Sequence, residues 1–228
     1  MKKHTSNLIK NIISSILVVL IFFLLFISLV NFTFNMLYVE TQVRGYSMQP
    51  TINLNAKNSY VKGDKIYINQ YSTFTNDDIV VAKVDWHSDY IIKRIVGTPG
   101  DKIQIKDLQD QYGVFVNDKL LYTKEKYGDL NAFPKTGSFG YYEEYEAFLI
   151  NPEFQPWVVH DINNHYIQLG ENEYFLMGDN WGHTTDSIAK GPVKTNEIIG
   201  KVDLIVNVTD NNPFTSTLFF LKKLFSID

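Results

Sequence analysis

Ser47 could act as a nucleophile, because it lies in a short turn-like stretch soon after a long apolar segment. That stretch reads Gly45-Tyr46-Ser47-Met48-Gln49-Pro50-Thr51. A serine hydroxyl is a weak nucleophile at neutral pH, so it needs a general base within hydrogen-bond reach and donors for the oxyanion that its attack creates. If Ser47 is a nucleophile, the rest of the chain must supply the base, the donors and a groove for the substrate.

Lys93 is the residue best suited to be that base. It lies in the strand-like run Ile91-Ile92-Lys93-Arg94-Ile95-Val96, where alternate residues share a face, so Lys93 points the same way as Ile91 and Ile95. Such a lysine either extends its charged end to solvent at a sheet edge or is desolvated, and desolvation lowers a lysine pKa. These residues alone favour the solvent-directed interpretation. We expect Arg94, on the opposite face, to be structural.

A second polar cluster follows an apolar strand near the C-terminal end. It reads Met177-Gly178-Asp179-Asn180-Trp181-Gly182-His183-Thr184-Thr185-Asp186-Ser187. Hydroxyls and carboxylates at this density are found in catalytic loops and also in solvated turns that are capped by their own side chains. The residues by themselves leave both interpretations open.

The composition excludes several other chemistries. The chain of 228 residues has no cysteine, so disulfides and thiol catalysis are excluded. The net charge is −4 and no basic stripe is present, which argues against nucleic acid as a partner. His160 and His165 have no matching metal ligands beside them, and we interpret them as loop histidines. We therefore expect no metal and no other cofactor.

The apolar segment is predicted to be a membrane anchor at residues 11–37. No charged residue occurs from Asn11 to Val39, and a spanning helix needs about 20 apolar residues. Lysines but no acidic residues occur in 1–10, and Glu40 follows the anchor, so the positive-inside bias places the N-terminus in the cytoplasm and the rest outside.

A cleaved secretory signal is the competing interpretation of this segment. Signal peptides have a shorter apolar core and end in a small-residue cleavage site. The apolar run here is longer, and the first alanine of the chain is Ala56. An uncleaved, single-pass anchor in the cell membrane is therefore favoured.

Residues 38–208 have the pattern of a mainly β domain. Short runs of β-branched residues end at Gly, Pro, Asn or Asp, which predicts strands and turns of a sandwich or barrel. The interval 123–165 lacks this pattern and is interpreted as an irregular accessory insertion with room for a hairpin. The predicted strands are 65–69, 79–84, 90–96, 102–105, 113–117, 166–169, 173–177 and 198–206.

The C-terminal tail, 209–228, carries a helical apolar stripe. Phe214, Leu218, Leu221 and Phe225 recur at helical spacing. A helix of this kind either lies in the membrane interface or packs on the body of the protein. The sequence does not decide between these two positions.

Together these features resemble the bacterial type I signal peptidases, membrane-anchored Ser-Lys proteases that remove signal peptides. The resemblance covers most of residues 10–206 except 123–165, and it implies a single anchor followed by a signal-peptidase-like β domain. Its motifs occur in the family order: the anchor, Gly45–Thr51, Tyr90–Asp101, and Met177–Asn180 with Asp186-Ser187.

The resemblance implies a role for five residues. Ser47 is the nucleophile, and its backbone N–H helps to form the oxyanion hole. Lys93 is the general base, which favours the desolvated interpretation of this side chain. Thr184 corresponds to a serine that orients the lysine, and Asp186 to a supporting carboxylate. Gly45 occupies a position where some members carry a hydroxyl donor, which glycine cannot supply.

The implied substrates are exported preproteins, which this family binds by strand addition. Small side chains are expected at the −1 and −3 positions of the signal peptide. Met48 and Ile92 are candidate pocket walls, although both could be ordinary core residues. Because Ser47 follows the anchor so closely, we expect the site to lie near the outer surface of the bilayer.

Two positions depart from the family pattern. Trp181 and Ile188 stand where the family has arginines, so the Asp–Arg support expected around Asp186 is missing or replaced. An alternative function is that of a non-catalytic or dedicated accessory factor for the assembly or secretion of surface proteins such as pilins. The altered third motif and the insertion favour it, and the retention of Ser47 and Lys93 argues against it.

Overall fold

The computed structural model describes most of the chain, in two compact units. One unit comprises residues 1–39 with 212–228, and the other comprises residues 40–211. Most of the predicted insertion, at 123–157 and 162–163, lies outside the described residues. The described residues are 2–54, 63–107, 112–122, 158–161, 164–180, 184–210, 212 and 214–225.

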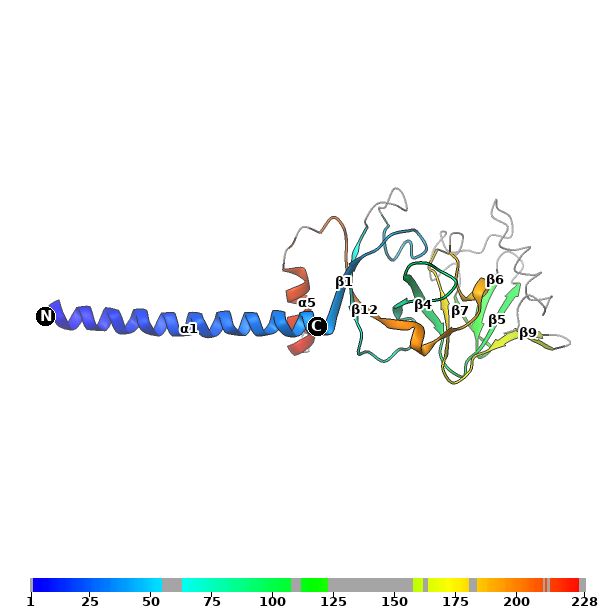
Figure 1. Cartoon of the computed structure of the whole chain (residues 1–228), viewed down its shortest axis with the longest axis horizontal. Helices are drawn as coiled ribbons and strands as arrows, with labels where there is room; N and C mark the ends of the chain where they lie inside the picture. The colour runs from blue at the N-terminus through cyan, green and yellow to red at the C-terminus, as the bar shows by residue number, and fades with distance from the viewer. Residues whose placement is uncertain are drawn as a thin grey trace. The chain divides into compact units, whose positions relative to one another are not determined.

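The smaller unit consists of two helices. Helix α1, Lys2–Leu37, contains no glycine or proline, so nothing in its sequence interrupts the backbone hydrogen bonds (Figure 1). Its part from Lys10 to Leu37 is long and apolar enough to cross a membrane, which fits the predicted anchor. Helix α5, Thr215–Phe225, forms where the apolar stripe predicts a helix.

The larger unit contains two antiparallel sheets, which confirms the mainly β prediction. The first sheet has seven strands in the order β1-β2-β12-β3-β4-β10-β11, and it carries the lysine motif on the inner strand β4. Strands β1 and β11 were not predicted. The bounds are β1 Tyr38–Gln42, β2 Lys65–Asn69, β3 Ile79–Ala82, β4 Ile91–Gly97, β10 Glu173–Met177, β11 Val193–Lys194 and β12 Ile198–Val206.

The second sheet has five strands in the order β7-β6-β5-β9-β8. Strands β8 and β9 form a hairpin in which His160 pairs with His165, at the end of the predicted insertion. Strands β7 and β8 were not predicted. The bounds are β5 Lys102–Asp107, β6 Tyr112–Val116, β7 Lys119–Tyr122, β8 Val158–Asp161 and β9 Asn164–Gln168.

Strand β4 is buried between other elements of the larger unit. It pairs with β3 on one side and with β10 on the other. Ile91 and Ile95, which flank Lys93 at alternate positions, belong to one buried apolar cluster with Val80. Val80 is also the register partner of Lys93. The backbone of Lys93 therefore lies in an apolar environment, and only the length of its side chain can bring the amine to polar groups.

Candidate active site

Lys93 and Ser47 meet directly in the larger unit. The Lys93 Nζ donates to the Ser47 Oγ at 2.8 Å and to the Ile92 carbonyl oxygen at 3.2 Å. Lys93 is only 4% exposed, so its side chain does not extend into solvent as the strand pattern alone favoured. The nucleophile and base predicted from the sequence are thus within hydrogen-bond reach of each other.

The pKa of Lys93 is lowered, chiefly by burial. Desolvation disfavours the charged ammonium, whereas the negative charges of Asp186 and, to a smaller extent, Asp179 act in the opposite direction. Burial has the larger effect, so the amine becomes neutral at a lower pH than an exposed lysine would. A neutral amine beside a serine hydroxyl can accept the proton of that hydroxyl.

The loop that carries Ser47 is held by backbone contacts on both sides of the serine. The Ser47 carbonyl accepts from the Asn180 N–H at 2.9 Å, and the Met48 carbonyl accepts from the Ile52 N–H at 2.9 Å. The Gly45 carbonyl accepts from the Asn53 side-chain amide at 3.1 Å. These bonds fix the backbone around the serine from both directions.

Asn53 and Asp64 close this loop against the second strand. The Asn53 N–H donates to the Asp64 carboxylate at 2.8 Å, and the Asp64 N–H donates to the Asn53 side-chain oxygen at 2.7 Å. Asn53 has φ of 63°, a left-handed conformation that asparagine tolerates well. The sequence pattern gives no sign of this pair, because the pair depends on two segments that meet only in the fold.

Gly45 adopts φ of 91°, a conformation that residues with side chains rarely adopt. A Cβ added there would meet no atom within 4 Å, so the backbone conformation rather than lack of space favours glycine. A hydroxyl-bearing residue at this position would require a change of backbone. This agrees with the expectation that no side-chain oxyanion donor comes from residue 45.

Met48 and Ile92 lie together in an apolar cluster beneath the serine loop. Met48 is buried with Ile52 and Ile66, and the partly buried Ile92 packs against the same cluster. Both residues therefore contribute to the core next to the site. Their predicted role as walls of the substrate pocket stays a prediction.

Asp186 is buried behind the lysine. It is 1% exposed, accepts the Gly178 N–H at 3.0 Å and the Ile188 N–H at 3.1 Å, and caps the short helix α4, Ser187–Lys190. Burial raises its pKa, and the Gly178 N–H, the charge of Lys93, the Ile188 N–H and a hydrogen bond from Thr184 counteract that rise. The Asp186 carboxylate is thus electrostatically linked to the base.

Gly178 and Thr184 bring this segment against the serine loop. A Cβ on Gly178 would lie 2.5 Å from the Ser47 carbonyl oxygen and would also overlap the Thr184 side chain. Only glycine therefore allows the three residues to approach in this way. Thr184 is buried, and its side chain interacts with Asp186 closely enough to lower the pKa of that carboxyl.

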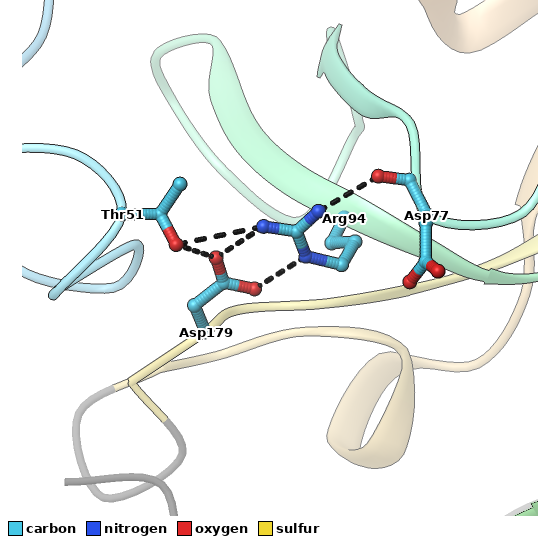
Figure 2. A network of polar contacts seen from close by, with 4 residues as sticks. All are labelled: Thr51, Asp77, Arg94 and Asp179. Carbon is cyan, nitrogen blue, oxygen red and sulfur yellow. Dashed lines mark hydrogen bonds and ion pairs between the residues drawn. The ribbon is translucent and has the colours of Figure 1, made fainter. Parts of the chain in front are cut away.

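The ion pair between Arg94 and Asp179, which the sequence pattern did not predict, joins the three motifs. The Arg94 Nε and Nη2 donate to the two Asp179 carboxylate oxygens at 2.8 and 2.6 Å, as Figure 2 shows. The Thr51 hydroxyl donates to the same carboxylate at 2.5 Å, and the Arg94 Nη1 donates to the Asp77 carbonyl oxygen at 2.7 Å. Met177 pairs in register with Arg94, which brings Asp179 close to the guanidinium.

Of the two positions that depart from the family pattern, Trp181 and Ile188, the structure describes only Ile188. Ile188 is buried in the apolar cluster that contains Val96 and Phe175. Trp181 lies outside the described residues. Asp186 is held by backbone N–H groups, Thr184 and the charge of Lys93, so its expected arginine support is replaced.

Within the described part of the chain, no group of three or more His, Cys, Asp or Glu residues is placed to hold a metal ion. The reactive groups that the described part of the site brings together are the buried Lys93 amine and the Ser47 hydroxyl.

Comparison with known proteins identifies the family. A family model described as "Signal peptidase, peptidase S26" matches residues 9–207. Signal peptidase I P of Bacillus subtilis subsp. natto is 28% identical over 217 residues, which cover 90% of this chain and 91% of that protein. Signal peptidase I of Streptococcus pneumoniae serotype 4 is 27% identical over 195 residues, which cover 78% and 87%.

A solved structure is also similar. The crystal structure of a signal peptidase I from Enterococcus faecalis V583 is 16% identical, covers 57% of this chain and 97% of that chain, and has a TM-score of 0.35. The family match extends from the anchor to the last long strand of the β domain. The chain therefore belongs to the signal peptidase family, peptidase S26, and is a membrane-anchored serine endopeptidase.

Proposed function

We propose that this enzyme removes N-terminal signal peptides from exported preproteins, with Ser47 as the nucleophile and Lys93 as the general base. The observation that carries the proposal is the 2.8 Å hydrogen bond between the Lys93 Nζ and the Ser47 Oγ. Lys93 is buried there, and burial lowers its pKa. Such a lysine can act as a base at a pH where an exposed one is protonated.

The reaction proceeds through an acyl-enzyme. The neutral Lys93 amine takes the Ser47 hydroxyl proton while the Oγ attacks the carbonyl carbon of the scissile peptide bond. The tetrahedral intermediate expels the amine of the mature protein, which receives the proton from Lys93. Lys93 then takes a proton from a water molecule, which attacks the ester carbonyl carbon. The bond between the Ser47 Oγ and the acyl carbon breaks, Lys93 returns the proton to the Oγ, and the signal peptide leaves with a new carboxylate.

The oxyanion of the tetrahedral intermediate is held in part by the backbone N–H of Ser47. Within the described residues, this N–H donates to no protein oxygen, so it is available to a substrate. The Ser47 carbonyl on the other side is fixed by the Asn180 N–H. That bond supports the role because a preorganised donor stabilises developing charge better than a mobile one.

The substrate segment lies extended beside the serine loop, with small side chains at −1 and −3. Met48 and Ile92 line the pockets for these side chains, and their position in one apolar cluster next to Ser47 supports this assignment. The N-terminus is cytoplasmic and the catalytic unit lies outside the cell membrane. The lysines before the anchor and Glu40 after it support this orientation.

Processing of a preprotein with an Ala-x-Ala site tests the proposal. Purified full-length enzyme in lipid vesicles should cut it, whereas Ser47→Ala and Lys93→Met should each lose at least about a thousandfold of kcat/KM. Ser88→Ala and Lys83→Met, at exposed positions, are the matched controls and should keep full activity. Full activity of Ser47→Ala would contradict the proposed mechanism. A wild type that leaves preproteins uncut but co-purifies with a partner would favour an accessory role.

The pH dependence gives a second readout for Lys93. Only the neutral amine accepts a proton, so the acylation rate should rise with pH until Lys93 is deprotonated and then level off. Because burial lowers the pKa of Lys93, this rise should occur at lower pH than for an exposed lysine. A rate independent of pH from about 5 to 9 would argue against Lys93 as the base.

A further inference from the structure

We infer that helix α5 is a second membrane contact, which lies in the bilayer interface beside the end of α1. The two helices belong to the same compact unit, so their contacts are defined. This inference does not depend on the proposed cleavage mechanism, because it concerns residues that are not part of the catalytic site.

One face of α5 packs on the last turns of α1. Phe220 is buried, and its ring lies 5.5 Å from that of Phe34 and 6.3 Å from that of Tyr38, measured between centroids. The Lys223 Nζ donates to the Tyr38 hydroxyl at 3.0 Å, and the Phe219 ring lies edge-on to the same tyrosine. This aromatic contact attaches α5 to the anchor.

A second face of α5 is apolar and uncovered. Leu218 and Phe225 of α5 and Phe214, directly before the helix, follow one another at helical spacing and are 51%, 56% and 65% exposed. They lie on a side of the helix other than that of the buried Phe220. A stripe of large apolar side chains that points away from the packed face needs an apolar environment of its own.

The position of α5 along α1 indicates that this environment is lipid. The part of α1 that can span a membrane has 28 residues and is about 42 Å long at 1.5 Å per residue, whereas the hydrocarbon core is about 30 Å thick. A helix of this length that stands upright in the bilayer extends beyond the hydrocarbon. Asn31, Thr33 and Asn35, together with Tyr38, give the C-terminal turns the mixed polar and aromatic character of the interface.

The length and charge of α5 fit the same position. Its 11 residues make a helix about 16 Å long, which is too short to cross the hydrocarbon core. Lys222 is exposed beside the apolar stripe, where it can reach lipid phosphates. A short amphipathic helix attached to the interfacial end of a spanning helix gives the enzyme two points of contact with the bilayer, which restricts rotation and tilt of the anchor.

Site-specific fluorescence tests this inference in the full chain. The protein has no cysteine, so Leu218→Cys or Phe225→Cys each accepts one environment-sensitive fluorophore. Asp118→Cys, in the exposed turn between β6 and β7, is the reference. The labelled proteins are reconstituted in phosphatidylcholine–phosphatidylglycerol vesicles and quenched either by aqueous iodide or by a nitroxide on the upper acyl chain.

At both α5 positions we expect the lipid nitroxide to quench at least about twofold more, and iodide at least about twofold less, than at Asp118→Cys. Quenching by iodide equal to that of the reference, with no lipid quenching, would place the stripe in water and overturn the inference. Protection from both quenchers would mean that protein covers the stripe, such as a second copy, and would also overturn it. Two positions are used so that one disturbed variant does not decide the outcome.

Discussion

Asp179 and Asp186 lie in the same segment and are almost equally buried, yet their charges are balanced in different ways. Asp179 is 3% exposed and forms a two-point ion pair with Arg94, to which the Thr51 hydroxyl adds a third bond. Asp186 is 1% exposed and accepts from backbone N–H groups, with the charge of Lys93 as an electrostatic partner. One carboxylate thus faces a permanent cation and the other a titratable one.

This difference indicates that the two carboxylates have different roles: Asp179 supports the structure of the site, and Asp186 affects the pKa of Lys93. A guanidinium stays charged at any working pH, so the Arg94–Asp179 pair can hold the serine loop, β4 and the segment after β10 together whether Lys93 is charged or neutral. In the proposed mechanism the Lys93 amine must become neutral to act, and the charge of Asp186 opposes that change. We therefore propose that Asp179 supports the geometry of the site, whereas Asp186 raises the pKa of Lys93 against the larger effect of burial.

Removal of the guanidinium should have the largest effect. Arg94→Gln leaves the buried Asp179 carboxylate without its cation, and loss of one partner of a buried pair costs about 3–5 kcal/mol. Denaturant unfolding of the full chain in detergent should show this loss, together with a strong decrease in preprotein cleavage. Thr51→Val, which removes one hydrogen bond to the same carboxylate, should cost about 1 kcal/mol.

The surface pair Lys65–Glu40 provides the matched control for Arg94→Gln. Its side chains are 42% and 46% exposed, so Lys65→Gln should change the free energy of unfolding by less than about 1 kcal/mol. If Arg94→Gln costs no more than Lys65→Gln, Asp179 is not the structural carboxylate and the contrast with Asp186 fails.

The sequence predicted the elements that depend on local pattern and missed those that depend on pairing with distant strands. The anchor and the strands at 65–69 and 102–105 depend on local hydropathy and on alternation along a few residues, so their types were correctly predicted. Strands β1 and β7, Tyr38–Gln42 and Lys119–Tyr122, lack a run of β-branched residues and were missed. Their pairing comes from the sheets that they join.

The site required more than local pattern. The run around Lys93 has the same appearance whether the amine is exposed or buried, and only the resemblance to a family favoured the buried state. The Arg94–Asp179 pair joins residues 85 positions apart, and it depends on the register of β4 and β10. Ile188 marked a departure from the family, but the backbone N–H groups that hold Asp186 have no signature in the side-chain sequence.

Asp186→Asn should change the pH profile and decrease the rate. Because the negative charge of Asp186 raises the pKa of Lys93, its removal lowers that pKa further, so the acid limb of the profile should move to lower pH. The plateau should fall, because an amide has one acceptor oxygen for the two N–H groups of Gly178 and Ile188. The profile of kcat/KM on a preprotein between about pH 5 and 10 measures both effects.

Asp118→Asn, at an exposed carboxylate, is the control and should leave the acid limb in place. An acid limb of Asp186→Asn that stays at the wild-type pH, or moves to higher pH, would contradict the electrostatic role of Asp186. A lower plateau without any movement of the limb would mean that this carboxylate is purely structural, as Asp179 is expected to be.

Thr184 allows the smallest and sharpest test, because it acts on the base through Asp186. Its side chain lowers the pKa of Asp186 and so favours the ionised carboxylate, which means that Thr184→Val should move the acid limb in the same direction as Asp186→Asn, but less far. Loss of one buried hydrogen bond of about 1 kcal/mol also predicts a several-fold decrease in kcat/KM. Thr184→Ser keeps the hydroxyl and should behave as wild type in the pH profile. If serine and valine shift the profile equally, the methyl packing of Thr184 matters rather than its hydroxyl, and the link from Thr184 through Asp186 to Lys93 is wrong.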